Sequence, residues 1–258
     1  MSRQGRFTPR RVEADGGEAP ERSLTAPVEQ RAALVIMAKA PREGFVKTRL
    51  ARAYSPSEVV RLYECMLRDT LALARSLRSV HVAVMCPSGD VREVSARLGP
   101  DVSDVVGQEG GGLAAALTSV FRHFVRTGFP RVIALDSDSP HLPREILESA
   151  FALLDENDLV IGPTEDGGYY LVGASEAHPK LFDAAPLGTS GAYDALLANA
   201  RVLGLSVGIT ENWYDVDVPA DLSRLAAELR LAPERAPRTA AFLDSLGRLS
   251  AQDEKRAL

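Results

Sequence analysis

The sequence predicts an α/β domain with helices on both faces of a mostly parallel sheet. Short runs rich in β-branched and aliphatic residues recur along the chain. Longer stretches between them repeat the apolar spacing of one helix face. Strands that alternate with helices are typical of a parallel sheet buried on both faces. We therefore expect a three-layer αβα sandwich with a mixed, mostly parallel sheet.

The first expected helix follows the first expected strand and has the clearest start. Ser55 stands in the N-cap position, Pro56 in the first helical position and Glu58 in the first turn. Further amphipathic helices are expected over residues 112–128, 143–157 and 219–233. The expected strands are the apolar runs 32–38, 80–86, 131–137, 158–164 and 168–174.

One folded domain over residues 31–230 is expected between two tails. Residues 1–30 are rich in Arg, Glu, Gly and Pro and have no apolar core like that of a signal peptide, so we expect a disordered tail. A helical tail is expected over residues 231–258. Because no stretch approaches the roughly 18 apolar residues of a membrane span, we expect a cytoplasmic protein without a membrane partner.

The composition argues against several classes of protein. The formal net charge of -5 disfavours a general nucleic-acid binder, so a polyanionic ligand must meet a local basic cluster. The two cysteines and four histidines show no metal-type spacing. A Gly-x-Ser-x-Gly elbow and a Gly-x-Gly-x-x-Gly loop are both absent, which disfavours an α/β hydrolase and a dinucleotide-dependent dehydrogenase.

A basic segment begins just beyond the first expected strand. It contains Lys39, Arg42, Lys47 and Arg49, with Gly44 allowing a close approach of backbone amides to a ligand. Ligands of such sheets bind beyond the carboxyl ends of the strands, and Arg can hold phosphate oxygens in bidentate fashion. The segment is a candidate phosphate-binding loop, and a solvated basic patch is the alternative.

Two Asp-x-Asp pairs follow apolar runs. Asp136 lies near the end of the run at 131–137 and Asp138 directly follows it, and Asp215 and Asp217 follow a strand-like run at 203–209. Two close carboxylates repel unless a cation offsets them, and Mg²⁺ uses one or two carboxylates together with phosphate oxygens. The alternatives are an Asp-Ser turn with helix capping at the first pair and an N-cap at Asp217.

The stretch at 162–173 is a candidate substrate-binding turn. Glu165 and Asp166 precede Gly167-Gly168, a turn dipeptide that joins two expected strands. Tyr169 and Tyr170 alternate across the following strand, so one can face a ligand while the other packs. A plain hairpin is the alternative.

Two small-residue segments precede expected helices. Thr189 and Ser190 suit an anion at a helix start, and they suit a simple cap equally well. Gly111 and Gly112 suit a backbone approach to a nucleotide base or a flexible turn.

The motifs together resemble a bacterial group of GT-A-fold proteins labelled glycosyltransferase-like and associated with radical-SAM and selenoprotein-type domains. The matching stretches occur in order over residues 33–230: MAKAPREGFVKTRLA, LDSDSPHL, GPTEDGGYYLVG, GTS and DVDVPADL. The wider superfamily is that of nucleotide-diphospho-sugar transferases. It includes molybdenum cofactor guanylyltransferase and 2-phospho-L-lactate guanylyltransferase. The group commonly has Cys-Pro at Ser139-Pro140 and Thr-Pro at Val218-Pro219.

The acceptor-side loop departs further from the group, with Leu187 where Trp is usual and Gly191 where Arg is usual. The resemblance implies that Lys47 and Arg49 hold nucleotide phosphates, and that Asp138 and Asp217 hold Mg²⁺ or Mn²⁺. Asp136 and Asp215 are weaker metal candidates.

The expected activity is nucleotidyl transfer with catalytic roles for Lys47, Arg49 and Asp138. A nucleoside triphosphate would give its nucleoside monophosphate to a small phosphorylated acceptor, and a cationic pair with Lys39 beside it suits a departing pyrophosphate. The first alternative is a glycosyltransferase that uses a sugar nucleotide donor, with Glu165 or Asp166 as general base. The second alternative is a non-catalytic nucleotide-binding module.

Overall fold

The computed structural model describes residues 31–102, 104–182 and 188–256, with side chains as far as residue 247. The tail expected at 1–30 and the departure at Leu187 lie outside the described residues. Within the described residues, no helix is long and apolar enough to cross a membrane.

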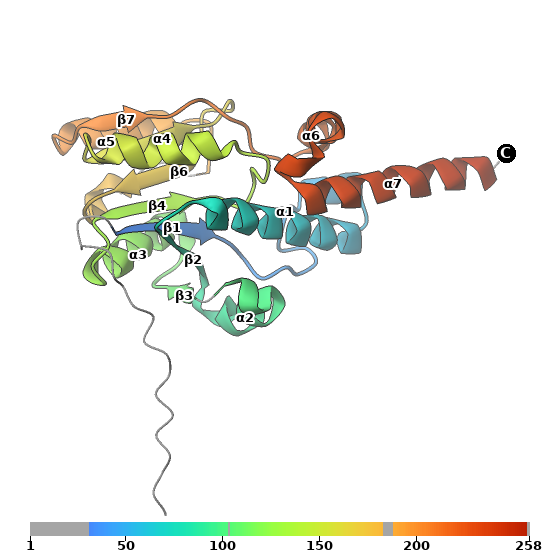
Figure 1. Ribbon diagram of the computed structural model, residues 1–258, viewed down its shortest axis with the longest axis horizontal. Helices are drawn as coiled ribbons and strands as arrows, with labels where there is room; N and C mark the ends of the chain where they lie inside the picture. Colours follow the sequence, from blue (N-terminus) through green and yellow to red (C-terminus); the bar gives the residue numbers. More distant parts are fainter. Residues whose placement is uncertain (1–30, 103, 183–187, 257–258) are drawn as a thin grey trace, which may run out of the picture.

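A seven-stranded sheet forms the centre of the described chain (Figure 1). Its order is β3-β2-β1-β4-β6-β5-β7. Only β6 runs antiparallel to its neighbours β4 and β5, while the other described pairs are parallel. The bounds are β1 Ala32–Met37, β2 Val80–Pro87, β3 Val105–Gln108, β4 Arg131–Leu135, β5 Leu159–Pro163, β6 Tyr169–Ala174 and β7 Val207–Ile209. The mostly parallel mixed sheet is therefore confirmed.

Helices cover both faces of the sheet, which confirms the three layers. Alternate residues of β1 enter different cores: Leu34 and Ile36 pack with α1, α2 and α4, whereas Ala33 and Val35 pack with α3 and α5. The bounds are α1 Pro56–Ser76, α2 Val91–Leu98, α3 Gly112–Arg126, α4 Arg144–Leu154 and α5 Ala192–Val202. A continuous apolar β1 is what burial on both faces requires.

The C-terminal helices pack on a further side of α1. The helices are α6, Pro219–Leu231, and α7, Pro237–Arg256, which runs outward from the sheet (Figure 1). Leu225 and Phe242 share an apolar cluster with Leu62 of α1. The buried carboxylate of Asp69 accepts hydrogen bonds from the backbone amide of Thr239, at 2.8 Å, and from its hydroxyl. This contact anchors the first turn of α7, inside the segment expected to be a helical tail.

Candidate functional site

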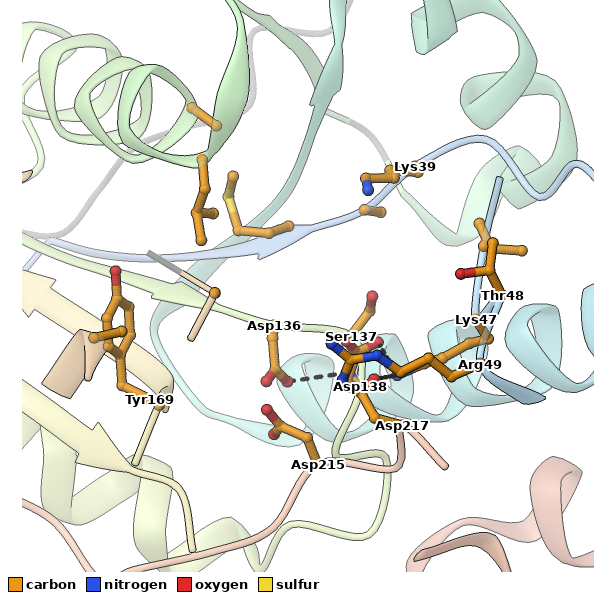
Figure 2. Close-up of a pocket in the computed structure, with 18 of the residues that line it drawn as sticks. Lys39, Lys47, Thr48, Arg49, Asp136, Ser137, Asp138, Tyr169, Asp215 and Asp217 are labelled. Carbon is orange, nitrogen blue, oxygen red and sulfur yellow. Dashed lines mark hydrogen bonds and ion pairs between the residues drawn. The ribbon is translucent and has the colours of Figure 1, made fainter. Parts of the chain in front are cut away.

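A cavity of about 760 Å³ lies at the carboxyl ends of β1 and β4 (Figure 2). The segments that follow these strands line it, together with the β5–β6 turn and the segments that precede α5 and α6. This is the edge at which parallel α/β sheets bind ligands. The predicted site residues that line the cavity are Lys39, Lys47, Arg49, Gly112, Asp136, Asp138, Asp166, Tyr169, Thr189, Ser190, Asp215 and Asp217.

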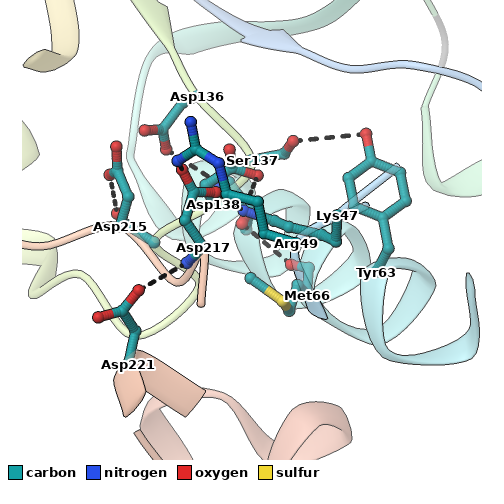
Figure 3. Close-up of polar contacts among 12 residues, drawn as sticks. Lys47, Arg49, Tyr63, Met66, Asp136, Ser137, Asp138, Asp215, Asp217 and Asp221 are labelled. Atoms are coloured by element: carbon teal, nitrogen blue, oxygen red, sulfur yellow. Dashed lines mark hydrogen bonds and ion pairs between the residues drawn. The ribbon is translucent and has the colours of Figure 1, made fainter. Parts of the chain in front are cut away.

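Lys47 joins the two Asp-x-Asp pairs (Figure 3). Its Nζ lies 2.8 Å from Oδ1 of Asp138 and 2.9 Å from Oδ1 of Asp217, and only 4% of its side chain is exposed. Burial alone would lower the pKa of this ammonium, but the two carboxylates outweigh it and raise the pKa. The side chain is therefore a charged, fully paired lysine.

The other basic residues of the segment differ in their partners. Arg49 is 65% exposed and lies 3.3 Å from Asp217 through its Nη1. Lys39 is exposed and enters none of the ion pairs among the described side chains, so its charge is available to a ligand. Arg42 pairs with Asp90, at 2.8 Å, and with Glu93. The solvated-patch alternative thus fits Arg42 better than the residues that line the cavity.

The backbone of this segment twice adopts the left-handed region. Gly44 has φ +77° and Lys47 has φ +44°. Glycine takes this conformation at no steric cost, whereas a lysine there is strained by about 1–2 kcal/mol. Gly44 does not line the cavity. The structure therefore supports a turn-forming role for Gly44, and the expected backbone contact with a nucleotide stays a prediction.

Asp136 and Asp215 form a second, half-buried carboxyl pair. Their side chains hydrogen-bond each other, and the Ser139 hydroxyl donates to Oδ1 of Asp215 at 2.9 Å. Burial and the charges of the neighbouring carboxylates raise the pKa of Asp136 well above its ordinary value. Burial is also the main cause that raises the pKa of Asp215 to about 6. Without a cation, the pair retains a proton that isolated carboxyls would lose.

The structure does not show the N-cap considered for Asp217, but it does show the local turn considered for Asp136 and Asp138. The backbone amides of Asp217 and Val218 both donate to Oδ2 of Asp221, so Asp221 satisfies the start of α6 while the carboxylate of Asp217 faces Lys47 (Figure 3). At the first pair, the amide of Asp138 donates to Oδ1 of Asp136 at 3.1 Å. That local turn is present, and it aims the Asp138 carboxylate at the cavity.

The donor set suits a hard divalent cation that also binds phosphate oxygens. Four carboxylates from two strand-end segments converge, and oxygen ligands are those that Mg²⁺ prefers. Among the described residues, no group of three or more His, Cys, Asp or Glu side chains has the arrangement of a preformed metal site. Because Mg²⁺ commonly takes one or two carboxylates and completes its shell with water and phosphate, the residues present fit such an ion.

Glu165 is not brought to the cavity. Its carboxylate binds Arg224 of α6 in bidentate fashion, at 2.7 and 3.0 Å, and this bond lowers its pKa. The Arg224 guanidinium also lies 3.7 Å above the ring centre of Tyr214. The expectation that Glu165 binds substrate is therefore not supported by its position. Its neighbour Asp166 does line the cavity and accepts a hydrogen bond from Gly168.

The tyrosines divide as alternation predicts. The Tyr170 side chain is buried, and its hydroxyl donates to the carbonyl of Glu211 at 2.9 Å and lies 2.6 Å from the hydroxyl of Thr210. Tyr169 lines the cavity, and its buried hydroxyl has no hydrogen-bond partner among the described atoms. Burial raises the pKa of Tyr169, so the group remains a neutral donor. It is available to a ligand in the cavity.

The β5–β6 turn packs directly against the segment that carries Thr189 and Ser190. Gly167 has φ +88°, and a Cβ atom added to it would lie 2.1 Å from the backbone oxygen of Ser190. Its carbonyl accepts a hydrogen bond from the amide of Tyr193 in α5. Gly167 and Gly111 do not line the cavity, and the contacts of Gly167 with Ser190 and Tyr193 support a structural role for it.

Replacing Gly167 by Ala is expected to lower the free energy of unfolding by about 3 kcal/mol, because the new methyl group would overlap backbone. Gly44→Ala is the matched control. Its φ is also positive, but no atom lies within 4 Å of the added Cβ, so only the conformational cost of about 1 kcal/mol applies. Urea denaturation measures both variants, and equal losses would contradict the packing argument.

Two apolar side chains at the cavity escaped the sequence analysis. Phe45 is 68% exposed and Leu113 is 42% exposed, and both line the cavity. Tyr63 of α1 was missed as well, although its hydroxyl accepts a hydrogen bond from the amide of Lys39 at 3.0 Å. An apolar residue in a loop or on a helix carries no sequence signal that separates a ligand contact from ordinary packing.

Comparisons of the sequence with known proteins find one family model and one similar characterised protein. A family model described as "Uncharacterized protein conserved in bacteria (DUF2064)" matches residues 70–189. The 2-phospho-L-lactate guanylyltransferase of Methanothermobacter thermautotrophicus is 29% identical over 187 residues, which cover 69% of this chain and 78% of that protein.

Solved structures of nucleotide-using transferases share the fold. A protein of Desulfovibrio desulfuricans G20 classed with nucleotide-diphospho-sugar transferases superposes with a TM-score of 0.78 at 28% identity, over 86% of this chain and 97% of that one. CMP:2-keto-3-deoxy-manno-octonic acid synthetase in complex with CTP gives a TM-score of 0.53 at 13% identity, over 78% and 99%. The resemblance drawn from the motifs is confirmed.

Proposed function

We propose that this chain, a transferase of the GT-A-like fold, is a metal-dependent nucleotidyltransferase. It moves a nucleoside monophosphate from a nucleoside triphosphate to a small phosphorylated acceptor and releases pyrophosphate. The observation that carries this proposal is the meeting of Lys47 and Arg49 with the carboxylates of Asp138 and Asp217 in one cavity. A triphosphate with its cation needs both kinds of group.

Each group has a distinct role in the transfer. An oxygen of the acceptor phosphate attacks the α-phosphorus, and the bond from that phosphorus to the pyrophosphate oxygen breaks. Lys39, Lys47 and Arg49 offset the charge that accumulates on the leaving pyrophosphate. Asp138 and Asp217, joined by Asp136 and Asp215, would hold Mg²⁺ or Mn²⁺, which supplies charge neutralisation on phosphate oxygens when bound.

The relatives support nucleotidyl transfer over its alternatives. The similar archaeal protein is a guanylyltransferase, and the structural neighbour in complex with CTP is a CMP-transferring synthetase. Because these relatives are transferases, they disfavour a non-catalytic nucleotide-binding module. Glycosyl transfer remains a second candidate, since the Desulfovibrio neighbour is classed with nucleotide-diphospho-sugar transferases and Asp166 lines the cavity as a possible base.

A thermal-shift screen separates the two candidates. The full chain with Mg²⁺ or Mn²⁺ is heated with ATP, CTP, GTP, UTP and a panel of sugar nucleotides. We expect one triphosphate to raise the melting temperature selectively, because a ligand at about 100 times its Kd adds about 2.7 kcal/mol to the free energy of unfolding. Pyrophosphate release with candidate acceptors then measures turnover. Stabilisation by a sugar nucleotide and by no triphosphate would replace nucleotidyl transfer with glycosyl transfer.

A further inference from the structure

The ammonium of Lys47 lies between the carboxylates of Asp138 and Asp217, the two residues that we propose as metal ligands. The Nζ atom is nearly equidistant from Asp138 and Asp217, at 2.8 and 2.9 Å, and the side chain is almost wholly buried. Arg49 reaches Asp217 from the solvent side. Lys47 and Arg49 together thus offset the charges of the two carboxylates that a divalent cation would bind.

A divalent cation and this ammonium compete for the same oxygens. A metal bound by Asp138 and Asp217 would lie close to Nζ, and like charges repel strongly at short range in a partly buried site. Mg²⁺ also gives up its water reluctantly. A free ion therefore gains little by entering while Lys47 keeps its place.

We infer that Lys47 is an internal counter-ion that excludes divalent metal from Asp138 and Asp217 until a triphosphate draws the ammonium away. This inference rests on the proposed function, because it requires Lys47 to exchange its carboxylate partners for phosphate oxygens when the nucleotide binds. In the free protein Lys47 binds carboxylates. In the loaded protein it binds phosphate oxygens and the metal takes the carboxylates, so that metal and nucleotide enter together.

The backbone conformation of Lys47 is consistent with a residue that its ion pairs hold in place. A φ of +44° is unfavourable for a lysine, and such strain persists only where surrounding contacts maintain it. The two carboxylates supply those contacts in the free protein. When phosphate oxygens replace them, the segment is free to take a different conformation.

Binding of Mn²⁺ alone tests the inference without any nucleotide. The signal of free Mn²⁺ in electron paramagnetic resonance is followed during titration of the full chain, wild type and Lys47→Met. We expect Lys47→Met to bind Mn²⁺ at least about tenfold more tightly than the wild type, because the competing charge is gone. Lys39→Met is the matched control: it removes the same charge from the cavity but breaks no described ion pair, and we expect a change below about threefold.

A second variant controls for misfolding, since Lys47→Met removes the ion pairs of Lys47 with Asp138 and Asp217. Lys47→Gln retains a donor for one carboxylate, and its melting temperature is measured with and without Mn²⁺. We expect Mn²⁺ to raise the melting temperature of the Lys47 variants and to leave those of the wild type and Lys39→Met nearly unchanged.

One result overturns the inference: the Lys47 variants bind Mn²⁺ no more tightly than the wild type does. Failure of the proposed function gives a different result. None of ATP, CTP, GTP and UTP then raises the melting temperature of the wild type in the presence of Mn²⁺, whatever the Mn²⁺ titration of the variants has shown.

Discussion

Replacing Asp138 or Asp217 by Asn is expected to lower turnover by roughly a thousandfold or more, because the proposed function assigns both carboxylates to the metal that neutralises the phosphates. The fold should persist. In either single variant Lys47 keeps one of its two carboxylates, so its buried charge is still paired. The measurement is pyrophosphate release at saturating nucleotide, with circular dichroism and a melting curve on the same samples.

The control for this loss is Asp194→Asn. Asp194 is exposed in the first turn of α5 and does not line the cavity, so its removal should leave turnover within about twofold of the wild type. Full activity in either Asp138→Asn or Asp217→Asn would refute the metal assignment for that residue. Raising the Mg²⁺ concentration should recover part of the lost activity, since weaker metal binding is opposed by mass action.

Replacing Asp215 by Asn is expected to stabilise the metal-free protein at pH 8 by on the order of 2 kcal/mol, since Asp215 has a raised pKa of about 6 in the fold. As the pH rises from about 4 to about 6, the unfolded chain loses this proton before the folded chain does. The wild type therefore loses stability across that window and does not regain it above. Asparagine has no proton to lose, so the variant avoids the loss.

Urea denaturation in EDTA at pH 4 and pH 8 measures the effect. Asp217→Asn is a control of opposite sign. Burial raises the pKa of Asp217, but the stronger attraction of Lys47 and Arg49 lowers it overall, so its ionised form stabilises the fold at pH 8. We expect Asp217→Asn to be less stable than the wild type at pH 8 and Asp215→Asn more stable. A stability difference for Asp215→Asn that does not vary with pH would contradict the linkage.

The strands that position the site could be predicted because both faces of the sheet are covered. Burial on two sides makes β1 and β4 continuous apolar runs, which stand out from the amphipathic helices. Two elements were missed. The strand β3 is four half-buried residues with a glycine, and the helix α2 is eight residues long, so neither is long enough to show a period.

The site was predictable where residues follow strand ends and not where it depends on contacts across the sheet. The Asp-x-Asp spacing indicated that carboxylates would gather, and they do. Nothing in the spacing indicated that Lys47 would stand between Asp138 and Asp217. Glu165 shows the converse, since its place in a motif suggested substrate and its partner is Arg224, which is remote in sequence. Long-range pairing of charges is decided by the fold.

The bond from Lys47 to Asp217 joins residues 170 positions apart. A ribosome makes the chain from its amino end, so Lys47 and Asp138 leave the exit tunnel well before Asp215, Asp217 and the helices α6 and α7. Until Asp215 and Asp217 have emerged, the nascent chain therefore carries Lys47 with at most Asp136 and Asp138 of the four carboxylates, so the ion pairs of the free site form only after that point.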